Sequence, residues 1–223
     1  MPEKLPPVEE FFPFWNKLLP DHQSDLKNFA APRILEKGTT IIPFKDNCLG
    51  LLLVQAGRLR CFIVSDEGRE VTLYRLYEYD ICLFSASCIM SNIQFEMHIE
   101  AEKDTPVLVV PTSLYDRLNT QSVAFSNYSN QLMSARFSDV MWTLEQILFK
   151  KMDSRIARSL LSQADNEETS TLSVTHDVIA RDLGTAREVV TRILKYFRSE
   201  GLIELSRGRI ELLNRPGLET LAD

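Results

Sequence analysis

The stretch that decides the fold runs from residue 175 to residue 200 and reads THDVIARDLGTAREVVTRILKYFRSE. Ala180 places a small residue where two helices of a helix-turn-helix would touch. Gly184 follows four residues later, where the tight turn needs a residue that tolerates positive φ. The hydroxyl of Thr185 can then accept a hydrogen bond as the cap of the second helix. The spacing therefore predicts a helix-turn-helix.

The second of these helices separates its residues into two faces. Its apolar residues recur at i, i+3, i+4 and i+7, which predicts a buried stripe: Val190, Ile193, Leu194 and Phe197. The opposite face carries Arg187, Glu188, Thr191, Arg192 and Lys195. Arg can bond bidentately to guanine and Glu can accept from cytosine, so this face suits the major groove of DNA. The alternative is a solvated, salt-bridged helix that touches no DNA.

Composition is that of an ordinary globular protein, with 44% hydrophobic and 25% charged residues among 223. No apolar run is long enough for a membrane span, and the N-terminus lacks the features of a signal peptide. A cytoplasmic location without a membrane partner is therefore expected.

The net charge of the chain is −6, yet the segment from Arg181 to Arg209 holds seven basic and four acidic residues. A basic tip on an acidic body predicts oriented docking on the phosphates of double-stranded DNA.

The preceding part of the chain changes its period twice. Residues 8–30 predict short helical pieces broken by Pro13 and Pro20. Short β-type runs follow at residues 33–38, 39–44, 50–54, 58–64, 70–76, 95–101 and 105–110. Many short strands at regular spacing predict a small antiparallel sandwich or barrel. Helical periodicity returns after Pro111, so the fold class is α+β.

A short helix is expected at residues 113–118 and a long one at about 122–151. The long helix carries an apolar seam with steps of 4, 3, 4 and 3: Met133, Phe137, Val140, Leu144 and Ile147. We favour pairing of this seam with a second copy of the chain. The alternative is that the stripe packs on the chain's own barrel, and both can hold for different faces.

The C-terminal part begins with Asp153 as the expected N-cap of a helix over 154–164. Residues 202–205 and 209–213 predict a β-hairpin, the wing, whose Arg207 and Arg209 could reach a phosphate beside the groove. The expected domains are a β-barrel sensor with its helical segment (1–120), a dimerisation helix (121–151) and a winged helix-turn-helix (152–223).

This order of elements resembles the cyclic-AMP receptor protein/FNR (CRP/FNR) family of bacterial transcription regulators over nearly the whole chain. The resemblance is most specific over SRIARSLL (154–161) and GTAREVVTRILK (184–195). It implies a jelly-roll barrel like that of cyclic-nucleotide-binding domains, a homodimer on a palindromic TGTGA-like site, and RNA polymerase as a further partner. The implied base contacts are Arg187, Glu188, Thr191 and Arg192. The implied backbone contacts are Thr175, His176, Thr185, Lys195, Arg207 and Arg209.

The sensor half departs from the cyclic-nucleotide binders of that family. Those proteins hold the phosphate with a Gly-Glu pair and then an Arg-Ser or Arg-Thr pair, whereas this chain has no Arg or Lys between Arg75 and Lys103. A buried phosphate without a cationic partner is unfavourable, so cyclic AMP is not expected as the effector. FNR-type iron–sulfur ligation needs cysteines near the N-terminus, and none precedes Cys48.

The effector is therefore an unknown small molecule, with an expected pocket at Phe84, Ser87, Cys88, Phe95, Met97 and His98. Cys82 and Cys88 could form a redox pair, although buried thiols are favoured. His98 with Cys88 or Met97 could ligate a haem, although a hydrogen-bonded His is favoured.

Two further functions compete with that of a regulator: a cupin-type metalloenzyme and a winged-helix interaction module. Only one of the three His residues lies in the expected barrel, so no enzymatic activity is expected.

Overall fold

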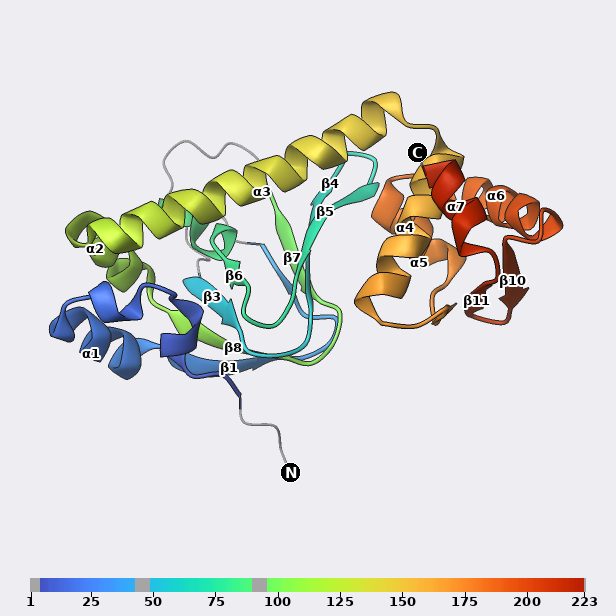
Figure 1. Cartoon of the computed structure of the whole chain (residues 1–223). Helices are drawn as coiled ribbons and strands as arrows, with labels where there is room; N and C mark the ends of the chain where they lie inside the picture. Colours follow the sequence, from blue (N-terminus) through green and yellow to red (C-terminus); the bar gives the residue numbers. More distant parts are fainter. Residues whose placement is uncertain (1–4, 43–48, 90–95, 223) are drawn as a thin grey trace. The chain divides into compact units, whose positions relative to one another are not determined.

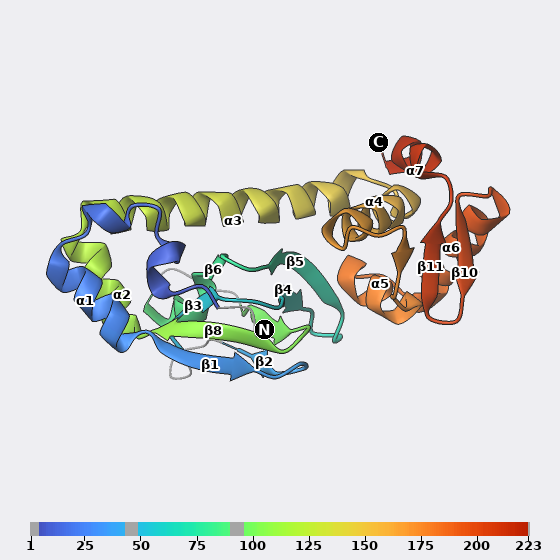
Figure 2. The same cartoon turned by 60° about the horizontal axis from the view of Figure 1, so that its bottom comes forward.

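The computed structural model describes residues 5–42, 49–89 and 96–222, with the side chains of 87–89 left aside. The chain forms two compact units (Figures 1 and 2). The first unit comprises residues 1–64 and 73–140, and the second comprises 65–72 and 141–223. None of the helices within the described ranges is long and apolar enough to cross a membrane.

The first unit opens with the short helical pieces that the sequence predicts. They are the 3-10 turns η1 (Val8–Phe11) and η2 (Trp15–Lys17) and the helix α1 (Pro20–Phe29). Pro20 is the first residue of α1, where its missing N–H is not needed. α1 lies beside α2 (Thr112–Gln121), and both flank one end of the sheets (Figure 1).

Two four-stranded antiparallel sheets follow, barrel-like but not closed. One sheet has the order β1 (Ala31–Leu35), β8 (Thr105–Val110), β3 (Leu51–Val54) and β6 (Ile81–Cys82). The other has the order β2 (Thr40–Ile41), β7 (His98–Ala101), β4 (Leu59–Val64) and β5 (Glu70–Leu76). The predicted antiparallel architecture is confirmed. The two-residue strand β6 was not predicted, because two residues are too few to show a period.

Alternation along the strands builds two separate cores in this unit. Leu52 and Val54 join the cluster that also holds β4, β5 and β7, whereas Leu51 and Leu53 join the cluster under the N-terminal helices. Every residue of β3 is therefore buried, and this strand reads as a continuous apolar run.

The long helix α3 (Val123–Phe149) confirms the predicted helix but divides the predicted seam between two faces. Met133 and Val140 pack against the cores of the first unit. Phe137, Leu144 and Ile147 are exposed. Met141 and Leu148 are also exposed, so the solvent-facing row is Phe137, Met141, Leu144 and Leu148, again with steps of 4, 3 and 4. Met133 and Val140 are seven residues apart and share the inward face, whereas Phe137 and Leu144, also seven apart, lie about 40° further round the helix.

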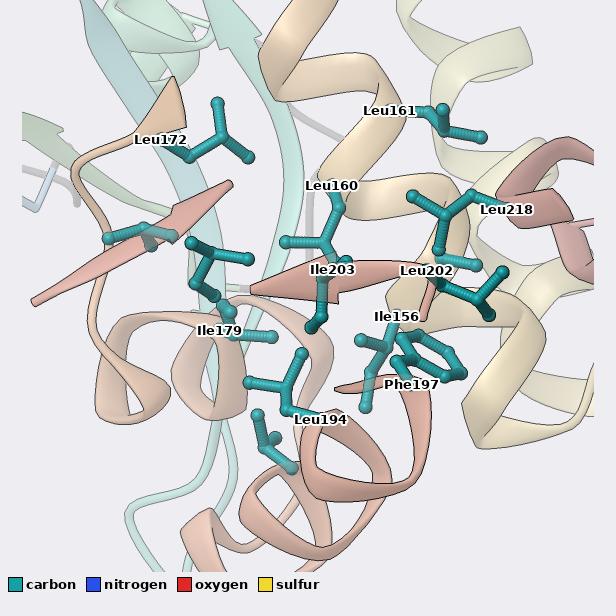
Figure 3. Close-up of a cluster of buried hydrophobic side chains, with 14 of the residues drawn as sticks. Ile156, Leu160, Leu161, Leu172, Ile179, Leu194, Phe197, Leu202, Ile203 and Leu218 are labelled. Atoms are coloured by element: carbon teal, nitrogen blue, oxygen red, sulfur yellow. The ribbon is translucent and has the colours of Figure 1, made fainter. Parts of the chain in front are cut away.

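The second unit has the predicted helices and wing, with two additional elements. Its elements are α4 (Met152–Asn166), β9 (Thr171–Leu172), α5 (His176–Leu183), α6 (Arg187–Ser199), β10 (Ile203–Ser206), β11 (Arg209–Leu212) and α7 (Arg215–Ala222). β9 pairs with β11, and α7 packs on α4. Neither β9 nor α7 was predicted. Figure 3 shows side chains from these elements converging on one core, including Leu160, Ile179, Leu194, Phe197 and Leu218.

The expected N-cap of α4 was wrong. The helix begins at Met152 and its cap position is Lys151, which makes no side-chain cap hydrogen bond. Asp153 lies in the first turn instead, where its Oδ1 accepts a hydrogen bond from the backbone N–H of Ser154 at 2.9 Å. A carboxylate there still interacts favourably with the N-terminal end of the helix dipole.

Candidate nucleic-acid interface

The turn between α5 and α6 has the geometry that its sequence predicts. Thr175 caps α5, and its Oγ1 accepts a hydrogen bond from the backbone N–H of Val178 at 3.3 Å. Gly184 ends α5 with φ +67° and ψ +36°, in the left-handed region. The expected capping role of Thr185 was wrong: the cap position of α6 is Ala186, without a side-chain hydrogen bond. Thr185 instead closes α5, because its backbone N–H donates to the carbonyl of Ala180 at 2.9 Å.

Besides its positive φ, a lack of space for a side chain also favours glycine at position 184. A Cβ at this position would lie 2.6 Å from Cγ2 of Val71, which belongs to the same unit. Gly201 has the same φ of +67°, but a Cβ there would meet nothing within 4 Å.

Replacing Gly184 by alanine should therefore destabilise the protein more than replacing Gly201. We expect Gly201→Ala to cost about 1–2 kcal/mol for its left-handed backbone, and Gly184→Ala roughly 1–2 kcal/mol more for the close contact. Urea denaturation monitored by circular dichroism measures both free energies of unfolding. Equal losses in the two variants would contradict a restrictive contact at Val71.

The helix α6 presents its polar residues to solvent and buries its apolar stripe as predicted. Val190, Leu194 and Phe197 are fully buried, and Ile193 is half-buried against the same core. Four of the α6 residues predicted to contact DNA are exposed: Arg187, Glu188, Arg192 and Lys195. Thr191 is half-buried. The stripe therefore fixes α6 on the core in the orientation that leaves its basic face accessible.

Arg187 is oriented by a carboxylate on the neighbouring helix. Its Nη1 lies 3.1 Å from Oδ2 of Asp177, and each side chain is 61% exposed. An ion pair this exposed is worth only about 0–1 kcal/mol. The guanidinium can therefore leave Asp177 for another acceptor at little cost.

His176 and Thr191 join the first turn of α5 to the middle of α6. The Nδ1 of His176 lies 2.9 Å from Oγ1 of Thr191. Partial burial lowers the pKa of His176, and the charges of Arg187 and Lys195 lower it further, whereas Asp177 raises it. The imidazole is therefore neutral at pH 7.

The wing contributes two more cations to the same unit. Arg207 lies in the turn between β10 and β11 and Arg209 begins β11, and both are exposed. Arg198 at the end of α6 forms an ion pair with Glu204 of β10, with 3.0 Å between Nη2 and Oε1. This ion pair connects α6 to the wing, so the two elements that carry the predicted DNA contacts are linked to each other.

Of the expected effector-pocket residues whose side chains the structure describes, two share one core and one does not. Phe84 and Met97 are buried in the core between the sheets, where the Tyr74 hydroxyl lies 3.6 Å from the sulfur of Met97. His98 points to the opposite face of β7, where its ring stacks on Phe62 with 5.1 Å between centroids. The expected pocket was wrong in placing His98 beside Met97, because adjacent strand residues face opposite sides. Phe95 and the side chains of Ser87 and Cys88 lie outside the described residues.

Three features of the sensor half were missed in the sequence. The thiols of Cys61 and Cys82 form a hydrogen bond, which lowers the pKa of Cys82, while burial raises the pKa of Cys61. Arg60 is fully buried, its Nη2 3.1 Å from Glu100 and its guanidinium 3.8 Å from the centre of the Phe62 ring. Arg136 of α3 lies 5.0 Å from the centre of the Tyr74 ring and forms ion pairs with Asp80 and Asp139. Arg60 and Arg136 lie outside residues 75–103, so the absence of Arg and Lys from that segment gave no sign of them.

Comparisons with known proteins give one consistent result. Residues 154–221 match the family model of the Crp-like helix-turn-helix domain. The chain is 49% identical to a putative transcriptional regulator of the crp/fnr family from Eubacterium rectale ATCC 33656, with a TM-score of 0.91 over 96% of this chain and 99% of that one. It is 24% identical to the cyclic AMP receptor protein of Thermus thermophilus, over 94% of this chain and 96% of that protein. It is 27% identical to the transcriptional activator protein FnrA of Stutzerimonas stutzeri, over 85% and 80% of the two chains.

Proposed function

The chain belongs to the CRP/FNR family of transcription regulators, and on that premise we propose that it binds a palindromic DNA site as a homodimer under the control of a small-molecule effector. The observation that carries the proposal is the solvent-exposed row of Arg187, Glu188 and Arg192 on α6. These residues would read base edges in the major groove, with a half-site like TGTGA.

Contacts to the DNA backbone would come from the rim of the same surface. Thr175 and His176 lie at the N-terminus of α5, and Arg207 and Arg209 lie on the wing. Thr185 and Lys195 complete this set. N-terminal helix N–H groups and cationic side chains both favour phosphate, so they would fix the position of α6 without reading sequence.

The exposed apolar row on α3 supports the homodimer. Phe137, Met141, Leu144 and Leu148 are each more than 40% exposed in the single chain. Apolar residues with this spacing on a 27-residue helix are the pattern of a two-stranded coiled coil. A second copy of α3 would cover them and would place two recognition helices about 34 Å apart, one turn of DNA.

The effector is not expected to be cyclic AMP. Two arginines of the first unit with little or no exposed side chain, Arg60 and Arg136, both form ion pairs with carboxylates. An incoming phosphate would have to displace those carboxylates, which is costly in a buried setting. An effector of different chemistry would bind one conformational state of the dimer more tightly and so shift the population toward or away from the DNA-binding state. RNA polymerase would be a further partner of the DNA-bound dimer.

A DNA titration at several salt concentrations tests the proposal. Six to ten phosphate contacts per dimer predict a loss of affinity of roughly a thousandfold or more between roughly 50 and 200 mM salt. Fluorescence anisotropy of a labelled duplex measures this slope, and adding cyclic AMP to the same assay should leave the affinity unchanged. An affinity that does not change with salt would contradict the phosphate contacts. A rise in affinity with cyclic AMP would contradict the exclusion of cyclic AMP as the effector.

A further inference from the structure

The contact between His176 and Thr191 connects a predicted phosphate ligand to a predicted base reader. His176 is the first residue of α5, and Thr191 shares one face of α6 with Arg187 and Lys195, at successive steps of four residues. With 2.9 Å between Nδ1 and Oγ1, the two groups form a hydrogen bond. We propose that His176 determines specificity at one base position, by fixing whether the Thr191 hydroxyl offers a donor or an acceptor to the base. This inference rests on the proposed function and adds a residue, His176, that controls base preference on the same surface.

The direction of the hydrogen bond follows from what the other ring nitrogen must do. A phosphate oxygen only accepts, so an Nε2 that contacts phosphate must carry a proton. In the neutral ring Nδ1 is then the acceptor, and the hydroxyl of Thr191 donates to it. The threonine has only its lone pairs and its methyl group left for the DNA. It can accept from adenine N6 or cytosine N4, or pack on the methyl group of thymine.

Protonation of His176 reverses this arrangement. Both nitrogens of the imidazolium donate, so Nδ1–H donates to Thr191 Oγ1 and the threonine hydroxyl is released to donate. Its partners would then be acceptors: guanine O6 or N7, adenine N7, or thymine O4. The same residue would thus prefer different bases on the two sides of the titration.

The charges around His176 make its pKa sensitive to DNA binding. Arg187 and Lys195 on α6 disfavour the imidazolium and Asp177 on α5 favours it, with partial burial as the largest effect. The pKa in the free protein is therefore below the ordinary 6.5. Phosphates at Lys195 and at Nε2 would raise the pKa of His176 in the complex. DNA affinity should accordingly rise as the pH falls through the pKa of the complex, and level off below that of the free protein.

The test selects preferred sites from random duplexes with the full-length protein at pH 5.5, 6.5 and 8.0 and constant ionic strength. We expect the wild type to change its base preference at one position of each half-site by about two- to tenfold, the ratio that one hydrogen bond supplies. Thr191→Val keeps the shape without the hydroxyl, so its preference should not change with pH. His176→Asn keeps a hydrogen-bonding group near the Nδ1 position without titrating in this range and should also be insensitive to pH.

A second measurement reports the tautomer in the DNA complex. The chain has three histidines, so ¹⁵N shifts of the His176 ring can be assigned by comparison with His176→Asn. In the complex at pH 8 we expect the Nε2–H tautomer, and the Nδ1–H tautomer would overturn the proposal. A site selected through Arg187 and Arg192 but identical at every pH would also overturn it, while leaving the proposed function intact. Absence of any selected site would overturn both.

Discussion

Replacing Arg187 by alanine should lower the affinity for the preferred site by about 2–6 kcal/mol per dimer. A bidentate arginine–guanine contact contributes about 1–3 kcal/mol of discrimination, and a homodimer would lose one contact in each half-site. The ion pair with Asp177 offsets little of this loss because both side chains are 61% exposed. Anisotropy titrations with the selected duplex and with a scrambled duplex measure the effect, and site selection should show one relaxed base position.

The matched control for this variant is Arg198→Ala. It removes the same charge from the same helix, but Arg198 lies in the last turn and pairs with Glu204 of the wing. We expect its loss to be small and similar on both duplexes. Equal losses for Arg187→Ala on the selected and scrambled duplexes would show that Arg187 contacts only the DNA backbone.

Leu144→Glu should convert the protein to a monomer. The side chain is 42% exposed in the single chain, so the fold of each protomer should survive the substitution. In the paired helices the two carboxylates would face each other in an apolar seam, and an uncompensated buried charge costs about 3–5 kcal/mol. Sedimentation at micromolar protein should give the mass of one 25.6 kDa chain. DNA affinity should fall to that of a single half-site.

Ser138→Glu serves as the control for the dimer variant. Ser138 is also exposed on α3, but it lies outside the row formed by Phe137, Met141, Leu144 and Leu148. Its carboxylate adds the same charge to the same helix, and the variant should remain dimeric. A dimeric Leu144→Glu protein would show that this row does not form the interface.

The sequence predicted the helix-turn-helix well because its signals are local. Gly184 is required by the left-handed turn, and the stripe of Val190, Leu194 and Phe197 recurs with the period of a helix. The same patterns predicted the wing and most strands. They did not predict β9 or α7, which are short and are held by pairing with β11 and packing on α4.

The sensor half was harder to predict because its contacts join distant parts of the chain. Arg136 reaches Asp80 across 56 positions, and Cys61 meets Cys82 from the other sheet. The sequence left a Cys82–Cys88 pair open because the two are near each other in the chain, but it favoured buried thiols, and Cys61 and Cys82 are both buried. His98 was grouped with Met97 for the same reason, although a strand turns adjacent side chains to opposite faces.

The most direct test of the central claim is selection of preferred duplexes from a random pool by the wild-type protein at about 0.1 M salt, followed by native mass measurement of the complex. We predict an enriched palindrome whose half-site centres are about 10 base pairs apart, bound by two protomers. A pool without enrichment, or an enriched single half-site bound by one protomer, would contradict it.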